Sequence, residues 1–422
     1  MTQIVMMQAD SSFGKIVFNL NHLRHLCSIF FIIICSSLQA QQQTIISGKV
    51  TEYGSNEGVP FVNVFFQGTS IGTVTDMEGK YVIKTSTPKD SIYVSQLGFQ
   101  TQTKAVKKGE SQAINFELTS KSLSLGTIEI LPGINPALRI IKNTIENRDK
   151  YNRENLTSIQ YLSYTKQQVD VDNITQKMRR LNFFNPITNM WDSIDAYSQT
   201  GETAQLPLAM SEIMSEIYSY KEAKKKHEDV KAVKVNFVGM KDGSAISKLV
   251  GTDFQSYNFY NNNVPVLEKD FLSPIATDAM LFYNYYLIDS SVVDSIKCYL
   301  IHVKPKNKKD LAYTGSIWIT DSTFILKQVD LEITKDVNFN LIDRVHIQQQ
   351  LIPTTAGPWV PAQTKVTLDY TNITKKFFSV VVNTYNVNSN YIINQPKQKD
   401  FYDTRIQFAE DAITKDSAYW IK

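Results

Sequence analysis

The chain has 422 residues, of which 42% are hydrophobic and 20% are charged, as expected of folded rather than disordered protein. Its formal net charge of +3 is too small to predict nucleic acid or an acidic membrane surface as a partner. Roughly 380 residues follow a short leader, which is more than one ordinary core holds and predicts two or three domains.

Residues 1–40 have the pattern of a secretory signal peptide. An unbroken apolar run at 29–34 follows the cationic Lys15 and Arg24, and the small residue Ala40 and a glutamine tract come after it. The run is far shorter than the ~20 residues that cross a bilayer as a helix. We therefore expect this leader to be removed and the mature chain to lie outside the cytoplasm.

The cysteines agree with such a division of the chain. Cys27 and Cys35 belong to the leader, so Cys298 stands alone in the mature part and cannot form an internal disulfide. Its strand-like surroundings predict a buried and inert thiol. Lipid attachment at Cys35 is an alternative, but the residues before it lack the small side chains that normally precede such a cysteine.

Residues 44–130 alternate short apolar segments with turn-forming residues. Strands are predicted at 45–50, 61–66, 73–75, 81–83, 91–95 and 114–118. Regular short strands with glycine between them predict a β-sandwich. Residues 76–79 suit a type I turn in which Gly79 supplies a positive φ. Asp76 and Glu78 are candidate calcium ligands in this turn, although a solvated hairpin is the favoured interpretation.

This segment resembles the carboxypeptidase-regulatory-like domain. The motifs that carry the resemblance follow in order at 48–50, 59–64, 68–81 and 94–99. The resemblance implies a prealbumin-like, seven-stranded sandwich of the kind found at the front of outer-membrane proteins in Gram-negative bacteria, including TonB-dependent receptors. That domain accompanies some peptidases without being catalytic, so its name implies no peptidase activity here.

A helix is predicted over 135–150, as a link to the second part of the chain. Asn135 can cap the free amides, and Pro136 suits the first helical position because its missing amide would be unpaired there anyway. One face of the helix is apolar and consists of Ala137, Ile140, Ile141, Thr144 and Ile145. We expect this face to pack on the following sheet. A membrane-surface role is the less favoured alternative, because the polar face has mixed charge.

Residues 156–422 are predicted to form a strand-rich body. Strands are expected at 159–166, 281–288, 295–304, 313–320, 324–334, 343–351, 359–370 and 377–387. Sequential strands with short links form an antiparallel meander, and such a sheet curls, so we expect a half-barrel-like shape. Segment 210–220 fits a helix and a strand equally. Lys224, Lys225 and Lys226 are expected in a solvated loop, with phosphate binding as the weaker alternative.

Further motifs at 135–141, 271–276 and 315–319 follow the sandwich in this order. Together they resemble an uncharacterised family of exported proteins from Gram-negative bacteria, in which the same sandwich precedes a region of unknown function. Members continue into an outer-membrane β-barrel, whereas this sequence stops at Lys422, which implies a truncated or split form. Residues 315–319 and 324–329 are also similar to the half-barrels of periplasmic lipoprotein carriers, which hold acyl chains on an apolar concave face.

No recognised catalytic pattern occurs. The sequence has no nucleophile elbow, no phosphate-binding loop and no dinucleotide fingerprint. The histidines, His22, His25, His227, His302 and His346, do not have metal-ligand spacing. The acid pairs Asp192–Asp195 and Asp289–Asp294 are typical of solvated loops, with a glycosidase-type role as the weak alternative. We therefore name no catalytic, cofactor-binding or metal-binding residue.

The sequence as a whole predicts a mainly β, exported, non-catalytic protein of the periplasm or outer membrane. It would be a binding or scaffolding module whose partner is an envelope protein or a lipid and not nucleic acid. One alternative is a periplasmic carrier of a lipid or lipoprotein acyl chain. The carrier requires an apolar groove under Ile317, Ile319, Ile325, Leu326 and Val329. The other alternative is an enzyme, which requires a pocket where acids or histidines converge.

Overall fold

The computed structural model describes most of the chain beyond the predicted leader. The described residues are 43–119 apart from 55–57, 61, 70, 77 and 97–98; 135–172; 180; 206–237 apart from 223; 257–370 apart from 294–295, 335 and 338–341; and 379–415. The leader, the acid pair Asp192–Asp195 and Asp294 lie outside them. The described part is mainly β, as the sequence predicts.

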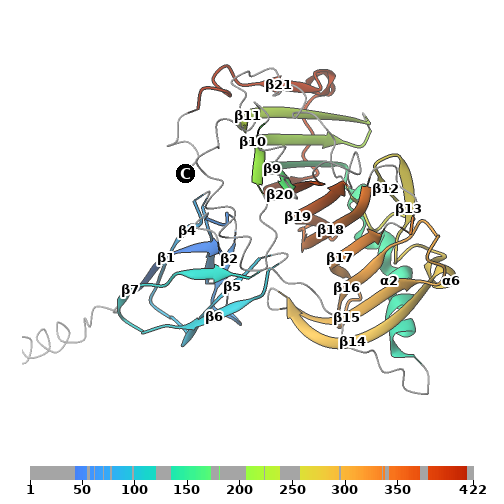
Figure 1. Cartoon of the computed structure of the whole chain (residues 1–422), viewed down its shortest axis with the longest axis horizontal. Helices are drawn as coiled ribbons and strands as arrows, with labels where there is room; N and C mark the ends of the chain where they lie inside the picture. The colour runs from blue at the N-terminus through green and yellow to red at the C-terminus, as the bar shows by residue number, and fades with distance from the viewer. Residues whose placement is uncertain are drawn as a thin grey trace, which may run out of the picture.

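A β-sandwich of two four-stranded sheets comes first in the chain (Figure 1). One sheet contains β1 (Thr44–Glu52), β4 (Lys80–Thr85), β7 (Ser111–Ala113) and β8 (Phe116–Leu118), and the other contains β2 (Asn63–Phe65), β3 (Gly72–Val74), β5 (Ser91–Ser95) and β6 (Gln102–Ala105). Alternate residues of these strands, among them Ile46, Val64 and Ile92, are fully buried between the sheets. The sandwich predicted from the strand pattern is therefore confirmed.

Two details of the sandwich differ from the prediction. The strand expected at 114–118 begins only at Phe116, as β8, and an unpredicted strand, β7, precedes it; both pair in parallel with β1, on either side of Ile114 and Asn115. Between these two strands, the Asn115 side-chain oxygen accepts a hydrogen bond from the Lys49 backbone amide at 2.8 Å, in place of a backbone carbonyl. Strand β6 was not predicted, because its exposed residues, Gln-Thr-Lys-Ala, have no apolar alternation.

The turn at 76–79 is built as predicted. Gly79 has a φ of 76°, and the Asp76 carboxylate accepts the backbone amides of Glu78 and Lys80 at 2.9 and 2.8 Å. A Cβ atom on Gly79 would lie 2.4 Å from the Val50 carbonyl oxygen, so both the turn and the close approach of β1 require glycine. Asp76 thus uses its carboxylate to hold its own hairpin together.

Helix α2 (Pro136–Tyr151) confirms the predicted link. The Asn135 side chain accepts the Ala137 amide at 3.0 Å, and the buried residues are Ala137, Ile140, Ile141 and Thr144. The helix packs beside β14 and its buried face belongs to the largest core of the molecule. The predicted docking on the sheet is confirmed. A short 3-10 helix, η1 (Arg153–Asn155), leads from α2 into the first strand of that sheet.

The second part of the chain is one large open sheet. Its order in the described residues is β14 (Tyr283–Val293), β15 (Ile296–Pro305), β16 (Thr314–Thr320), β17 (Leu326–Thr334), β18 (Ile342–Pro353), β19 (Trp359–Tyr370), β20 (Ser379–Ile393), β9 (Ser158–Asp172), β10 (Leu206–Tyr220), β11 (Lys225–Phe237) and β21 (Ile406–Phe408). All neighbours are antiparallel except β11 and β21. The predicted meander is therefore confirmed as β14 to β20, and β9 to β11 extend it beyond β20.

Some predicted boundaries in this sheet need correction. The strand expected from 281 begins at Tyr283, because residues Ala279–Phe282 form a single helical turn, α6. The undecided segment 210–220 is a strand, since β10 is hydrogen-bonded to β9 and to β11 over nearly its whole length. Lys224 lies in the turn after β10, at a φ of 50°, whereas Lys225 and Lys226 already belong to β11. All three lysines are exposed, as predicted.

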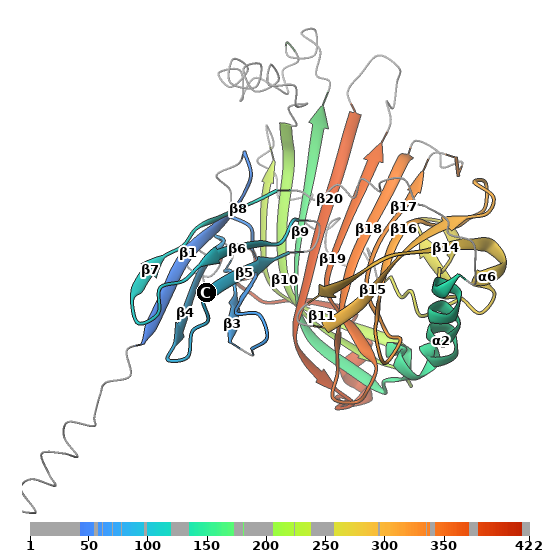
Figure 2. The same ribbon diagram turned by 90° about the horizontal axis from the view of Figure 1, so that it is seen from below.

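The large sheet has the sandwich on one side and α2 on the other, as two perpendicular views show (Figures 1 and 2). On the side of α2, the core is filled by the helix and by residues 257–276. These residues include the hairpin of β12 (Asn263–Val266) and β13 (Lys269–Leu272). Fully buried aromatic rings from this filling, such as Phe259 and Phe271, contact Tyr313 at ring-centre distances of 5.5 Å. The sequence itself therefore covers much of the apolar face of the sheet.

Candidate functional site

Lys365 of β19 joins the large sheet to the sandwich. Neighbouring residues of a strand point to opposite faces. Val366 belongs to the core under α2, whereas the Lys365 ammonium lies 5.5 Å from the ring centre of Phe99 in the sandwich and 4.9 Å from that of Tyr385 in β20. A cation between two aromatic rings is attracted by both. This contact holds the two parts of the molecule against each other.

A cavity of about 650 Å³, here called the sandwich–sheet groove, lies between the two parts. It is within the size range of small-ligand and peptide sites. Its lining residues come from the β2–β3 hairpin on one side and from β18, β19 and β20 on the other. They are Asn63, Val64, Phe65, Thr69, Ile71, Gly72, Thr73, Val74, Gln350, Ile352, Ala362, Gln363, Val387, Asn388 and Ser389.

The sandwich wall of the groove ends in an open strand edge. Strand β3 is the outer strand of its sheet and pairs with β2 alone among the described residues. The backbone amide of Phe66 donates to the Ile71 carbonyl at 3.0 Å. The backbone amide of Thr75 donates to the Val62 carbonyl, also at 3.0 Å. Hydrogen bonds alternate along an antiparallel pair, so Thr73 points its backbone groups at β2. The backbone groups of Gly72 and Val74 therefore point away from the sheet, and the Val74 side chain is 50% exposed.

The opposite wall is shaped by an irregularity in β19. The register between β18 and β19 shifts beside Gln350, so that Ala362 is an extra residue there. The Asn388 side chain donates to the nearby Pro361 carbonyl at 3.3 Å. Asn388 is 7% exposed, and its side-chain oxygen has no hydrogen-bond partner among the described residues. Because Tyr385 faces the sandwich and side chains alternate along a strand, Val387 faces the groove and Asn388 faces the opposite side of β20.

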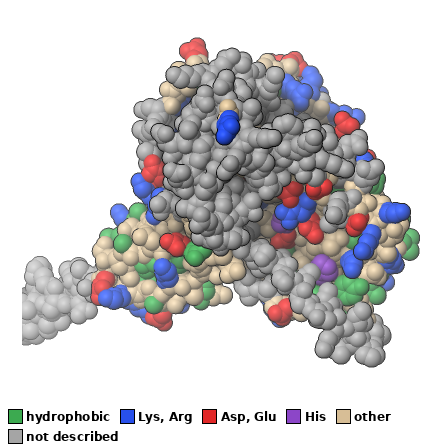
Figure 3. Space-filling view, in the orientation of Figure 1, with side chains coloured by type: hydrophobic (Ala, Val, Ile, Leu, Met, Phe, Trp, Pro, Cys, Tyr) green, Lys and Arg blue, Asp and Glu red, His purple; other side chains and the backbone are tan. Residues whose placement is uncertain are grey.

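The chemistry of the groove is that of a binding site. Its described lining contains backbone, amide, hydroxyl, aliphatic and aromatic groups and no acid, histidine, lysine, arginine or thiol. General acid–base chemistry and nucleophilic catalysis need an ionisable group within hydrogen-bonding distance of the reacting atoms. The groove therefore suits an uncharged, partly apolar ligand. On the face shown in Figure 3, acidic and basic side chains are interspersed over the described surface.

The structure places His227, His302 and His346 in separate settings. His227 contacts the Thr404 carbonyl and the Asp229 carboxylate, and His346 contacts Asp330 at 2.6 Å. His302 is buried, and this burial lowers the pKa of its imidazole. The described residues contain no group of three or more His, Cys, Asp or Glu side chains that could hold a metal ion. None of the three lines the groove.

The remaining residues singled out from the sequence are also apart from the groove. Glu78 pairs with Lys80, and this contact lowers the pKa of the Glu78 carboxyl. Cys298 is fully buried, as predicted. Lys225 forms a 2.6 Å ion pair with Asp403. Asp289 lies at the bulge in β14, and its proposed partner, Asp294, is outside the described residues.

The apolar groove required by the carrier alternative is already filled at the expected positions. Ile317, Ile319, Ile325, Leu326 and Val329 are each at most 5% exposed and belong to the core under α2. Ile140 and Ile141 of the helix and Phe259 of the filling lie in the same cluster. An acyl chain at these positions would have to displace the side chains of the protein itself.

Two comparisons with known families agree with the architecture. Residues 140–391 match a family of unknown function, DUF5686, and residues 46–130 match the CarboxypepD_reg-like domain. The first match covers more than half of the chain, so this protein belongs to the family of unknown function DUF5686. The resemblance inferred from the motifs at 48–50, 59–64, 68–81 and 94–99 is confirmed, as is the order of the two regions.

Individual relatives are more distant. The chain is 28% identical over 113 residues to TonB-dependent receptor P3 of Formosa agariphila, and the match covers 27% of this chain and 11% of the receptor. The chain therefore spans only a small part of the length of that relative. Within the described residues, no helix combines the length and the apolarity needed to span a bilayer.

The solved structures that match this chain resemble it only weakly, both in sequence and in fold. A DUF1329 family protein from Desulfovibrio piger is 11% identical, with 64% of this chain and 98% of that chain covered and a TM-score of 0.24. A LolA superfamily protein from Nitrosomonas europaea is 7% identical, with coverages of 64% and 99% and a TM-score of 0.21. The MucA/MucB complex of Pseudomonas aeruginosa is 9% identical, with 60% of this chain and 94% of that chain covered and a TM-score of 0.18. Scores of this size carry no argument about function.

Proposed function

We propose that this protein is an exported, non-catalytic module of the cell envelope that binds an extended, uncharged segment of another envelope protein in the sandwich–sheet groove. The signal-peptide pattern of residues 1–40 and the similarity to a TonB-dependent receptor support the location. We also propose a division into a sandwich at 44–130, a linking helix at 135–150 and a strand-rich domain at 156–422.

The observation that carries this proposal is the open edge of β3, which lies beside a groove whose described lining has no charged side chain. An extended peptide can add to a free strand edge through backbone hydrogen bonds, while pockets for alternate side chains give selectivity. Gly72 and Val74 offer outward-pointing amides and carbonyls, apart from a 3.4 Å contact of the Thr73 hydroxyl with the Val74 carbonyl. At about 3.3 Å per residue, β3 offers roughly 10 Å of edge, which is enough for three or four peptide residues.

The opposite wall supplies groups that such a peptide would need. The side-chain amides of Gln350 and Gln363 line this wall and can hydrogen-bond to a peptide backbone. Ile352 and Val387 offer apolar surface for side chains that point away from β3. A charged residue inside the groove would lose its hydration without gaining a partner of opposite charge, so the segment must be neutral.

Site-specific photo-crosslinking in the host tests the proposal. A photoreactive amino acid replaces Val74 in one strain and Val82 in another; the two valines are 50% and 54% exposed, but Val82 lies on β4, in the other sheet of the sandwich. We expect Val74 to label one defined stretch of an envelope protein and Val82 to leave that stretch unlabelled. Equal labelling from both positions, or cytosolic protein as the product, would contradict the proposal.

Binding of the labelled stretch as a synthetic peptide provides the second half of the test. We expect Val387→Ala to weaken binding to the purified chain about three- to tenfold, the effect of losing two methyl groups from a partly buried contact. The same variant should be folded, because Val387 is only half-buried. Lipid in place of peptide at the Val74 position would favour the carrier alternative and refute the peptide.

A further inference from the structure

A glycine in strand β3 interrupts a row of aromatic side chains beside the sandwich–sheet groove. Directly opposite residues of paired strands carry their side chains on the same face of a sheet. Tyr93 of β5 is opposite Phe65 of β2, and Phe65 is opposite Gly72 of β3, so the three residues form one row across the sheet. Two aromatic rings are therefore followed by a position that has no side chain.

This row lies on the outer face of the sandwich. Val64, the neighbour of Phe65 in β2, is fully buried between the two sheets of the sandwich. Because successive side chains of a strand point to opposite faces, the Phe65 side chain points outward. Phe65 is only partly buried, and its ring stacks on that of Tyr93 at a ring-centre distance of 6.0 Å and an interplanar angle of 26°. Tyr93 therefore supports one side of the Phe65 ring.

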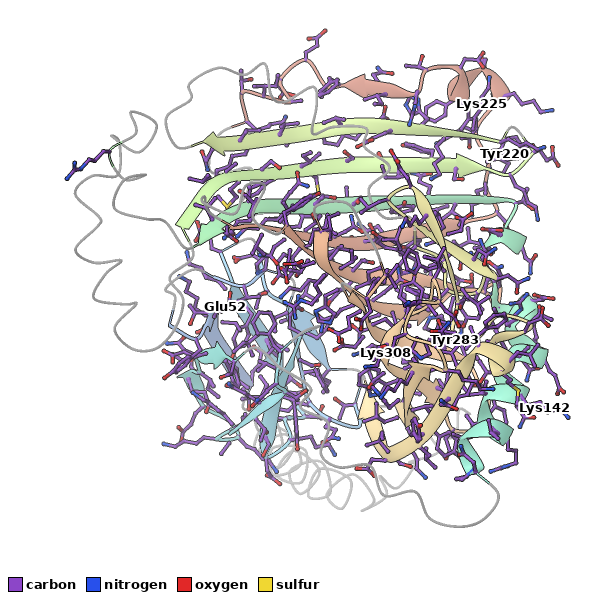
Figure 4. All side chains as sticks on the ribbon, turned by 45° about the vertical axis from the view of Figure 1, so that its right-hand side comes forward. Glu52, Lys142, Tyr220, Lys225, Tyr283 and Lys308 are labelled. Carbon is purple, nitrogen blue, oxygen red and sulfur yellow. The ribbon has the colours of Figure 1, made fainter. Side chains whose placement is uncertain are left out.

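The open space lies on the glycine side of the Phe65 ring. Phe65 and Gly72 both line the sandwich–sheet groove, whereas Tyr93 is not part of its lining. Figure 4 shows the sandwich, on which Glu52 is labelled, beside the large sheet, on which Tyr283 is labelled. The space over Gly72, here called the Gly72 notch, is thus bounded by the Phe65 ring where the two parts of the molecule meet.

Position 72 has no room for a side chain that could fill this notch. A Cβ atom on Gly72 would lie 2.8 Å from the Phe65 Cβ atom and 2.9 Å from the Val64 carbonyl oxygen, closer than Cβ atoms approach other atoms in proteins. Glycine inside a strand often marks a place where a ligand or another backbone approaches closely. A side chain that fills the Gly72 notch has to come from a strand that adds to β3.

We propose that the sandwich–sheet groove selects segments that place an aromatic side chain beside Gly72; this inference rests on the strand addition proposed above. The backbone groups of Gly72 point away from β2, so a residue of an added strand pairs with Gly72 and carries its side chain on the face of Phe65. An aromatic ring there lies across Gly72 and against the Phe65 ring. Aromatic side chains stabilise sheets at edge glycines in this way, and paired rings attract each other beyond the burial of their surface.

The opposite wall of the groove suits the same side chain. Ile352, Ala362 and Val387 supply aliphatic surface there, and the small Ala362 side chain occupies little of the space. The described lining has no charged group, so a neutral ring enters without losing an ionic partner. Leucine offers a similar apolar volume but no attraction between rings. The inference therefore distinguishes phenylalanine from leucine at the residue beside Gly72.

Neutral pentapeptides with blocked ends test this preference. Each probe has two threonines on either side of a central phenylalanine, leucine or alanine, and NMR titration measures its binding to the purified chain. We expect the phenylalanine peptide to bind about three- to tenfold more tightly than the leucine peptide, which is the range of ring–ring attraction. The alanine peptide should bind more weakly than both. A ring-current shift at the Gly72 amide, seen only with the phenylalanine peptide, would locate the ring in the notch.

Two matched variants assign the preference to Phe65. Phe65→Leu removes the ring beside the Gly72 notch, and Tyr93→Leu removes the ring one strand farther away; both side chains are only partly buried, so both variants should fold. Phe65→Leu should make the phenylalanine and leucine peptides bind equally, whereas Tyr93→Leu should keep the preference for phenylalanine. Loss of the preference in Tyr93→Leu but not in Phe65→Leu would overturn the assignment to Phe65.

The outcomes separate this inference from the strand addition on which it rests. Equal affinity of the parent chain for the three pentapeptides, with slowed exchange at the Gly72 and Val74 amides, would overturn the aromatic preference and leave strand addition standing. Failure of all three to bind, while the peptide identified by crosslinking does bind, would have the same meaning. Failure of both kinds of peptide to bind would refute strand addition as well.

Discussion

The packing of α2 against the large sheet predicts a large and specific loss of stability when Ile141 is truncated. Ile141 is fully buried in the core, and Ile141→Ala removes three carbon atoms. At ~0.8 kcal/mol per buried methylene, the transfer term alone is about 2.4 kcal/mol. The cavity left behind raises the expected loss in the free energy of unfolding to between about 2.5 and 5 kcal/mol.

Leu138→Ala is the matched control for Ile141→Ala. It removes three carbon atoms from the same helix, but Leu138 is 38% exposed and should cost less than about 1 kcal/mol. Urea denaturation followed by tryptophan fluorescence is a suitable assay, because the segment 44–130 contains no tryptophan while Trp318 and Trp359 lie in the large sheet. Similar, small losses for both variants would refute the conclusion that the sheet is filled by its own helix.

Two further variants test local features of the fold. Gly79→Ala should lower the free energy of unfolding by about 1–3 kcal/mol more than Gly68→Ala, because both glycines have positive φ but only Gly79 faces a backbone oxygen within 3 Å; equal losses would contradict the tight approach of β1. Burial depresses the pKa of His302, so its contribution to stability is present above the unfolded pKa of ~6.5 and is lost as the pH falls through the folded value. Unfolding free energy should therefore fall below pH 6.5 by at most ~1.4 kcal/mol per pH unit from this group, and His302→Gln should flatten that part of the profile.

Local signals made helix α2 predictable from the sequence in full. The cap at Asn135, the proline at the first position and the apolar face at Ala137, Ile140 and Ile141 are all set by neighbouring residues. The meander from β14 to β20 was also predictable, because its strands follow one another and alternate in polarity. Its boundaries were less predictable: in α6, which precedes β14, Ala279 is buried in the core, whereas Leu281 and Phe282 are exposed.

Other elements depend on partners far away in the chain. Segment 210–220 has residues at helical spacing, and only its hydrogen bonds to β9 and β11 make it a strand. Cavities between distant segments have the same origin. The sandwich–sheet groove brings Gly72 and Val74 to Val387, and a second cavity, of about 480 Å³, brings η1 to the ends of β9 and β10. None of these residues carries a motif, so sequence reasoning could not predict either cavity.

Hydrogen exchange at β3 addresses the binding of an extended peptide most directly. The amides of Gly72 and Val74 point outward, whereas that of Thr73 points at β2. On addition of the crosslinked peptide, exchange should slow at Gly72 and Val74 and stay unchanged at Thr73. Peptide binding with no added protection at Gly72 and Val74 would contradict strand addition at this edge.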